Sequence, residues 1–394
     1  MLAILICLII AIIILVLYLS KSLNINRIII FICTFFIIYF IALPKTCINS
    51  TISGTKMFFV SVFPSLFAFL IICNILIKYN GINIYAKIIG KPLCAPLRLP
   101  ASCSLVLIIS ALCGYPLGAK YSSELYDKKI IDFNTFERLI NIASNASPVF
   151  IVGTVGISML NSNIIGYLLL ATSYMTCIIM SLILPINNKN HNFRSENSFK
   201  KNNNEDKSSL NIGIVLKESI EGSIKSSLSI GGYIIFFSVI IDTLKNSFAS
   251  RYLLYHVFGN SIFSNIIYSL CLGLIEITNG CKLLSELSIP LYTKGVIISF
   301  LMSFGGLSIL SQVYSFLCKY QNISIKKYIR RKLLQGCISS MVFSILFFSF
   351  ESYSTLSTFY AEKTNSISPL YILPLLILII PMLLFRMKRL FHIS

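Results

Sequence analysis

Long apolar runs alternate with short polar segments along almost the whole chain. Seven runs are long enough to cross the hydrocarbon core of a bilayer: Leu2–Leu19, Ile28–Leu43, Met57–Ile77, Ile164–Leu184, Leu228–Leu244, Gly336–Phe350 and Leu370–Phe385. The first run has no charged segment before it and no A-x-A site after it, so we expect a retained span and not a cleaved signal. The pattern predicts an all-α, multi-pass membrane protein.

Two further regions are apolar but interrupted. They extend from Ala101 to Leu160 and from Ile262 to Leu317, and they contain Gly, Pro, Asn and charged residues where a plain span carries Leu and Ile. Between them, Asn187–Ser209 is polar and rich in Asn, Lys and Ser, a composition typical of a flexible linker. We extend this predicted linker to residue 225.

The two interrupted regions match each other. Gly118–Leu125 and Gly280–Leu287 agree at five of eight positions, at a constant offset of 162 residues. The same offset aligns Ser65-Leu66 with Ser227-Leu228 and places Asn145–Pro148 near Gly305–Ser308. A register shared by three elements favours a duplication.

Each matching region predicts a re-entrant hairpin followed by a helix that is broken in mid-membrane. The hairpin tips are Gly114–Gly118 and Glu276–Gly280, and the breaks are Asn145–Pro148 and Gly305–Gly306. Such backbone is tolerated at membrane depth only where protein or a water-filled cavity surrounds it. The predicted organisation is two transmembrane helices in 1–50, a first repeat in 51–186, a linker in 187–225, a second repeat in 226–335, and two helices with a basic tail in 336–394.

The distribution of charge supports a membrane protein and gives its orientation. Only 12% of the residues are charged, against about 25% in soluble domains. The net charge is +19, but the basic residues lie between apolar runs, which indicates topology and contact with anionic lipid, not nucleic acid. One predicted face, which includes 187–225 and 318–335, carries 22 Lys and Arg, and the other carries 6. The N-terminus is then outside, the C-terminus is cytoplasmic, and the two repeats are inverted.

An inverted repeat with two hairpins and two broken helices is the layout of a solute carrier. Each break starts a half-helix whose first N–H groups lack partners and attract carboxylate or phosphate. The predicted substrate-binding residues are Gly114, Tyr115, Gly118, Lys120, Asn145, Ser147, Glu276, Thr278, Asn279, Gly280, Lys282, Gly305, Gly306, Ser308 and Gln312.

Structural alternatives exist for several of these residues. Gly114 and Gly118 can have the single role of allowing two helices to pack closely. Lys120 and Lys282 each precede a glutamate by four positions and can pair with it. Glu276 is harder to explain this way, because an intramembrane carboxylate is costly and usually functional. It can bind a coupling proton or sodium ion, or accept a hydrogen bond from substrate.

The sequence carries no enzyme motif that we recognise. It contains no G-x-S-x-G, no HExxH and no P-loop, and its twelve cysteines include no CxxC. Its three histidines are far apart in the sequence. We therefore expect no catalytic residue, no bound metal and no cofactor other than a coupling ion, Na⁺ or H⁺.

Five motifs together resemble the YlbJ family of sporulation integral membrane proteins. They are Phe63–Phe67, Cys113–Lys120, Asn145–Phe150, Glu276–Gly280 and Gly305–Ser308, and the resemblance covers roughly residues 55–350. It implies a nucleoside-recognition Gate domain similar to the core of concentrative nucleoside transporters. Glu276 and Asn279 resemble the glutamate and asparagine of the transporter signature, but their spacing differs, which leaves the coupling ion open.

The resemblance also implies a role in spore formation. The family is linked to the delivery of dipicolinic acid from the mother cell toward the forespore, across the outer forespore membrane. Dipicolinate is a small aromatic dicarboxylate, which suits a site made of half-helix N-termini and lysines. Two alternatives stay open: a nucleoside carrier, and a structural protein of spore assembly that does not transport. The implied partners are a small anion and the lipid bilayer, and assembly into a homo-oligomer stays open.

Overall fold

The computed structural model describes residues 25–185, 211–246 and 262–354. Every regular element within these ranges is helical, so the predicted all-α class is confirmed. Four helices are long and apolar enough to cross a membrane, or up to six if each of two bent pairs forms one span. The predicted multi-pass character is thereby confirmed, while the predicted spans Leu2–Leu19 and Leu370–Phe385 lie outside the described residues.

The described chain begins with two helices that meet at a proline. α2 (Ile25–Ala42) and α3 (Pro44–Met57) belong to a pair of segments bent by 106°. Pro44 has no backbone N–H and its ring blocks the preceding turn, so one helix ends and the next begins there. The π-helix η1 (Phe58–Val62) then leads into α4. Both α3 and α4 pack along α11 (Ile212–Asn246).

Two stretches of the chain share one order of elements: a long helix, two short helices joined by a turn, an interrupted helix, and another long helix. In the first stretch these are α4 (Phe63–Lys78), α7 (Ser104–Cys113), α8 (Leu117–Asp127), α9 (Phe133–Ile142), η4 (Val149–Met159) and α10 (Asn163–Ile183). In the second they are α11, α13 (Ile262–Ile275), α14 (Ile277–Glu286), α15 (Leu291–Phe304), α16 (Gly306–Leu317) and α17 (Ile325–Ser354). Between α4 and α7 lie the short elements α5 (Gly81–Tyr85), η2 (Ala86–Gly90), α6 (Lys91–Cys94) and η3 (Ala101–Cys103).

The helix ends repeat the offset of the sequence motifs. α7 and α13 end at Cys113 and Ile275, which are 162 positions apart. α10 and α17 begin at Asn163 and Ile325, again 162 positions apart.

Two segments that the sequence assigns to polar loops are helical. α11 begins at Ile212, so residues 212–225 of the predicted linker belong to this helix. α17 begins at Ile325, so residues 325–335 of the predicted cytoplasmic loop are also helical. The apolar runs mark only the inner parts of these helices, because a helix continues into polar sequence wherever its neighbours support it. The remainder of the linker, up to residue 210, lies outside the described residues.

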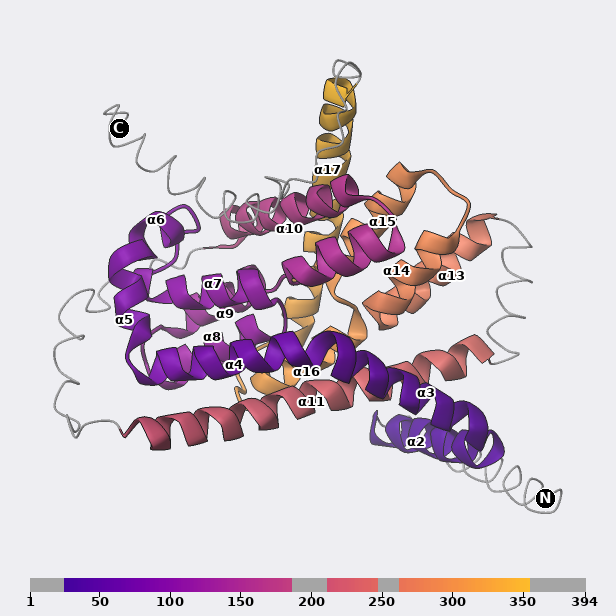
Figure 1. Ribbon diagram of the computed structural model, residues 1–394, viewed down its shortest axis with the longest axis horizontal. Helices are drawn as coiled ribbons and strands as arrows, with labels where there is room; N and C mark the ends of the chain where they lie inside the picture. The colour runs from indigo at the N-terminus through magenta and orange to yellow at the C-terminus, as the bar shows by residue number, and fades with distance from the viewer. Residues whose placement is uncertain (1–24, 186–210, 247–261, 355–394) are drawn as a thin grey trace.

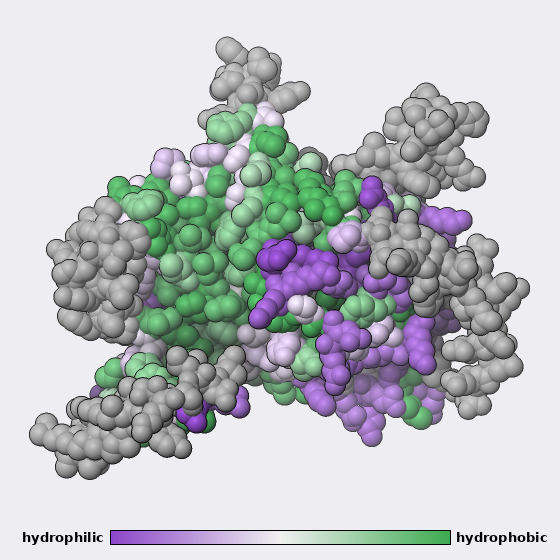
Figure 2. Space-filling model, turned by 180° about the vertical axis from the view of Figure 1, so that it is seen from behind, coloured by the Kyte–Doolittle hydropathy of each residue, from purple (hydrophilic) through white to green (hydrophobic). Residues whose placement is uncertain are grey.

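The short helices α7, α8 and α9 form the interior of the first stretch. They lie between α10 on one side and α4 with α11 on the other (Figure 1). Large apolar side chains are exposed on the outer helices, and Met341 and Ile345 of α17 expose 67% and 66% of their surface. Figure 2 shows a broad hydrophobic area beside a hydrophilic one. Soluble monomers rarely expose such areas, whereas a lipid-facing surface requires them.

Candidate functional site

The first turn is fastened to the first helix break. Gly114 follows α7 with a φ of 80°, and a Cβ there would lie 2.5 Å from the backbone nitrogen of Ser147. The next residue, Tyr115, donates its backbone N–H to the carbonyl oxygen of Asn145 at 2.6 Å. At Gly118 a Cβ would lie 1.8 Å from the carbonyl oxygen of Ala143. Gly114 and Gly118 therefore both permit close packing of the tip on the break.

The second turn is shorter than the sequence predicts. α13 ends at Ile275 and α14 begins at Ile277, so the turn is Glu276 alone. Its carboxylate accepts hydrogen bonds from the backbone N–H groups of Thr278 and Asn279 and from Asn279 Nδ2, each at 2.9 Å. Glu276 thus caps α14, and the predicted tip residues Thr278, Asn279 and Gly280 lie in the first turn of that helix.

The second break also lies against the turn of its own stretch. Gly305 and Gly306 separate α15 from α16 with φ values of 90° and 69°. A Cβ at Gly306 would lie 3.1–3.3 Å from the carbonyl oxygens of the last residues of α13, Gly273, Leu274 and Ile275. The two halves α15 and α16 nevertheless cover 27 residues as one candidate span. This span is therefore interrupted within its length, as predicted.

Two of the four half-helix N-termini already hold a side-chain cap. Glu276 caps α14, and Ser147 Oγ accepts from the backbone N–H of Phe150 at the start of η4, at 3.3 Å. The N-termini of α8 and α16 have no side-chain cap, and these two helices contact each other. Ser308, in the first turn of α16, and Gln312, in its middle, are buried and joined by a 3.4 Å hydrogen bond. The half-helix N-termini without a side-chain cap are therefore those of α8 and α16.

Contacts also join the two stretches. The Tyr320 hydroxyl, which follows α16, donates to the carbonyl oxygen of Ser123 in α8 at 3.1 Å. The Tyr115 hydroxyl belongs to the first turn. This hydroxyl is buried and has no hydrogen-bond partner in the described ranges. α14 also contacts η4. The first turn thus lies against the first break and the second turn against the second break, while the side chain of the predicted residue Lys282 is exposed.

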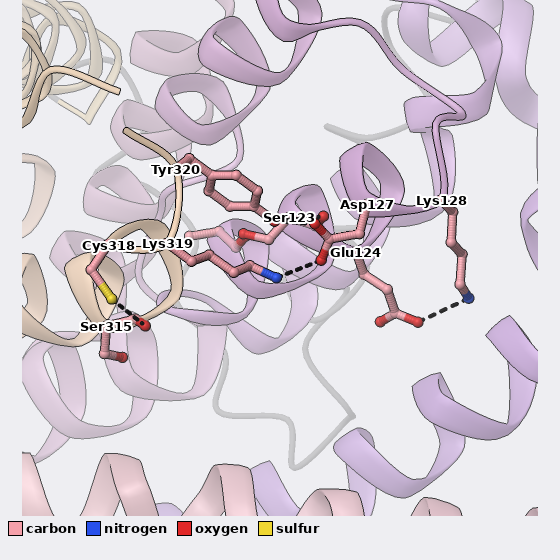
Figure 3. Close-up of polar contacts among 9 residues, drawn as sticks. Ser123, Glu124, Asp127, Lys128, Ser315, Cys318, Lys319 and Tyr320 are labelled. Carbon is pink, nitrogen blue, oxygen red and sulfur yellow. Dashed lines mark hydrogen bonds and ion pairs between the residues drawn. The ribbon is translucent and has the colours of Figure 1, made fainter. Parts of the chain in front are cut away.

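The lysines do not pair with the glutamates four positions after them. Glu124 directs its carboxylate to Lys128, at 3.0 Å, and not to Lys120 (Figure 3). Lys120 Nζ lies 5.0 Å from the centre of the Tyr121 ring. Neither Lys120 nor Lys282 forms an ion pair within the part of the chain that the structure describes. The pairing alternative is therefore wrong for both.

Lys332 is the largest omission from the sequence-based site. Its side chain is 1% exposed, and its Nζ donates to the carbonyl oxygen of Ser144, 3.0 Å away, just before the first break. It also donates to Gln335 Oε1 at 2.9 Å, and Gln335 Nε2 reaches Cys177 Sγ at 3.2 Å. Cys177 in turn donates to Asn145 Oδ1 at 2.6 Å. This group, with Tyr328, ties the first break to α10 and α17.

A sequence signal for this group exists. The polar residues Tyr328, Lys332, Gln335 and Ser339 recur at helical spacing, and all four are buried. The signal was hidden because residues 318–335 read as a basic loop. A second omission is Lys245, at the end of α11, whose Nζ donates to Asn279 Oδ1 at 2.8 Å.

The polar segment after α8 is also less solvent-exposed than its composition indicates. Asp132 caps α9 through the backbone N–H of Thr135, at 3.2 Å. Arg138 is buried and donates to carbonyl oxygens that include those of Leu97 and Ser181, each at 3.1 Å. Among the described residues no group of three or more His, Cys, Asp or Glu is placed to hold a metal ion.

Comparison with known proteins bears on this arrangement. No protein-family model matches the chain, and no solved structure matches it. The chain is 26% identical over 324 residues to the sporulation integral membrane protein YlbJ of Bacillus subtilis (strain 168). The match covers 77% of this chain and 78% of that protein. The resemblance to the YlbJ family of sporulation integral membrane proteins, which the tip and break motifs indicate, is thereby confirmed.

Proposed function

We propose that the protein is a membrane carrier for a small organic anion in spore formation. The first candidate substrate is dipicolinic acid, moved from the mother cell toward the forespore across the outer forespore membrane. Similarity to a sporulation integral membrane protein supports the cellular setting. Dipicolinate itself comes from the family resemblance, and the arrangement of the interior supports an anion.

The observation that carries the proposal is the contact of each turn with the helix break of its own stretch. Within a bundle that contains helices long enough to cross a membrane, the backbone is not helical at four places. These are Gly114–Pro116, Ala143–Pro148, Glu276 and Gly305. In hydrocarbon, such departures persist only where protein or a cavity surrounds them. Discontinuous helices that meet at the centre are the substrate site of many secondary transporters.

One of these helix ends already accepts a carboxylate from the chain itself. The Glu276 carboxylate occupies the N-terminus of α14, held by two backbone N–H groups. The N-termini of α8 and α16 offer the same partial positive charge without a side-chain cap. Lys120, half-buried near the start of α8, adds a full charge close to one of them. A substrate carboxylate there would repeat the interaction that Glu276 makes.

The proposal includes an inverted relation between the two stretches. The repeated order of elements and the common offset of 162 support a duplication. The inversion rests on the 22-to-6 distribution of Lys and Arg. Single cysteines in 187–210 and 355–368, on a cysteine-free background, test it with an impermeant thiol reagent on intact cells. We expect labelling of 355–368 only, and external labelling of 187–210 would overturn the inversion.

Transport is tested with the purified protein in liposomes. We expect time-dependent uptake of labelled dipicolinate that unlabelled dipicolinate competes and uridine does not. Protein-free liposomes provide the background. Competition by uridine would favour the nucleoside carrier, in which stacking on Tyr115 replaces the charge of Lys120. Background uptake of both solutes would favour a structural role in spore assembly.

The coupling ion is tested by imposing a Na⁺ or an H⁺ gradient in the same assay. Both carboxylate oxygens of Glu276 are engaged in capping α14. We therefore expect Glu276→Gln to lower stability by about 1 kcal/mol, as for the loss of a helix cap, and to leave the ion dependence of uptake unchanged. Loss of the ion dependence in a stable Glu276→Gln protein would instead assign the coupling ion to this carboxylate.

A further inference from the structure

Lys332 is a buried ammonium without an acidic partner. It lies two turns inside α17, with 1% of its side chain exposed, and its two hydrogen-bond acceptors are the Ser144 carbonyl and the Gln335 amide oxygen. Both acceptors are uncharged. The nearby acid of α9, Glu137, is bound to Lys327 at 2.9 Å and to Arg331 at 3.1 Å. Within the described ranges, no ion pair involves Lys332.

A structural role as a helix cap does not balance the charge. Ser144 follows α9, so the ammonium lies near the carboxyl end of that helix, where a cation is favourable. That interaction is weak compared with the penalty of burying an unpaired ion, which is larger at membrane depth. An anion that binds beside Lys332 would supply the counter-charge that its two uncharged acceptors do not.

We infer that the Lys332 ammonium is the counter-charge of the transported anion, an inference that rests on the proposed function. A carboxylate of the substrate replaces the Ser144 carbonyl as an acceptor of Lys332 Nζ. Gln335 Nε2 and the Tyr328 hydroxyl, which lies 3.1 Å from Ser144 Oγ, are the neighbouring donors. The ligand class is a small carboxylate, and an uncharged solute leaves the ammonium uncompensated. Lys332 is then a binding residue beside the first break, distinct from Lys120.

Binding requires a rearrangement that the contacts define. Lys332 is closed off from the surface, and the Ser144–Tyr328 and Ser144–Lys332 hydrogen bonds hold the first break against α17. The proposed exchange of acceptors breaks the Ser144–Lys332 hydrogen bond and so loosens the first break from α17. Entry of the anion and movement of the break are thus one event.

Gln335→Glu is the sharpest test, because it places a carboxylate where Gln335 Oε1 lies, 2.9 Å from Lys332 Nζ. The new internal ion pair has nearly the same shape and compensates the ammonium permanently. Lys332→Met removes the charge and keeps the bulk. Lys326→Met, the same change at an exposed position of the same helix, is the matched control. For each protein we measure the unfolding midpoint in detergent with and without dipicolinate, with uridine as the neutral probe, and dipicolinate uptake in liposomes.

We expect dipicolinate to raise the midpoint of the wild type and of Lys326→Met, and uridine to leave both unchanged. Gln335→Glu should fold with an unchanged or higher midpoint. It should bind and take up dipicolinate about tenfold less well or worse, as for the loss of a charge-assisted contact. Lys332→Met should show the same loss, which keeps the test valid if one of the two variants fails to fold.

The outcomes separate this inference from the proposed function. Wild-type uptake with equal uptake by folded Gln335→Glu would overturn the role of Lys332 and leave the carrier standing. Stabilisation of the wild type but not of Gln335→Glu, without uptake in any protein, would support the anion site and overturn the carrier. A wild type that neither binds nor transports dipicolinate would overturn both.

Discussion

The two helix breaks occupy equivalent places in the chain but are held by different means. The first is fixed by polar partners from other elements: Tyr115 N–H and Cys177 bind Asn145, and Tyr328 and Lys332 bind Ser144. The second has two successive glycines at positive φ, packed on the carboxyl end of α13. One break is therefore determined by distant contacts and the other by local backbone freedom.

The difference indicates where the protein can change shape. A break held by hydrogen bonds between elements opens when those partners exchange, and the partners are the groups that we propose for anion binding. A break formed by glycines keeps its geometry without partners. We therefore expect the first break to respond to substrate and the second to act as a fixed element.

The largest expected effect is on the packing that supports the first break. In Gly118→Ala the new Cβ would lie 1.8 Å from the carbonyl oxygen of Ala143, and backbone must move to relieve the clash. We expect a loss of about 3 kcal/mol in the free energy of unfolding. Thermal unfolding in detergent measures it. Gly153→Ala, where nothing lies within 4 Å, is the control and should be nearly neutral. A stable Gly118→Ala protein would show that the tip and the break are not in close contact.

Substitutions at the second break should destabilise the protein through backbone strain and not through steric clashes. Gly305 has a φ of 90°, and the nearest atom to a new Cβ belongs to the flexible side chain of Ile309, at 3.3 Å. Gly305→Ala should therefore destabilise by about 1–2 kcal/mol, and Gly305→Asn by less, because Asn tolerates positive φ better. Gly232→Ala, inside α11 and with nothing within 4 Å, should instead stabilise by about 0.5–1 kcal/mol. Equal effects of Ala and Asn at Gly305 would contradict control by φ.

The hydrogen bond between Ser144 and Tyr328 offers a double-mutant cycle at the first break. Ser144→Ala and Tyr328→Phe each remove one partner of a buried 3.1 Å bond and should each destabilise by about 1 kcal/mol. The double variant should lose less stability than the sum of the two single losses. Each single variant leaves one hydroxyl without its partner, whereas the double variant removes both hydroxyls. Chemical denaturation of the four proteins gives the coupling. Strict additivity would show that the first break does not depend on this contact.

The smallest effect is expected away from both breaks. Asp127 pairs with Lys319, and its other oxygen accepts from the Tyr320 hydroxyl at 2.7 Å (Figure 3). The hydrogen bond from Lys319 to Asp127 raises the pKa of the Lys319 ammonium, so this contribution to stability is present below the unfolded pKa and is lost as pH rises through the folded pKa. Because the pair is exposed, Asp127→Asn should destabilise by at most about 1 kcal/mol, and less in high salt. A salt-independent loss of several kcal/mol would contradict this assignment.

The sequence was informative where a residue type restricts the backbone. Gly114, Pro148 and the pair Gly305–Gly306 interrupt apolar runs, and the structure has a turn or a break at each place. Five of the seven apolar runs lie within the described ranges, and each of them is helical over almost its whole length. These features depend on local steric preferences, which a single sequence displays.

The sequence was less informative where a side chain depends on its neighbours in space. Glu276 reads as a residue of the hairpin tip, but its carboxylate caps α14 because the turn is one residue long. Lys332 reads as one of several loop lysines, but it is buried in a helix that packs against α9, α10 and α15. Composition cannot show which face of a polar helix is covered by protein.

The partners of Ser144 also determine when the first break can adopt its final packing during synthesis and membrane insertion. Tyr328 and Lys332 follow Ser144 by 184 and 188 residues, so they leave the ribosome long after the first break has entered the membrane. The second break packs on α13, which is synthesised shortly before it. During synthesis the carbonyl and hydroxyl groups of Ser144 therefore lack these partners until α17 has been inserted. A chain that stops after α16 should be degraded and not accumulate as a stable half, because its earlier break never acquires the helix that closes it.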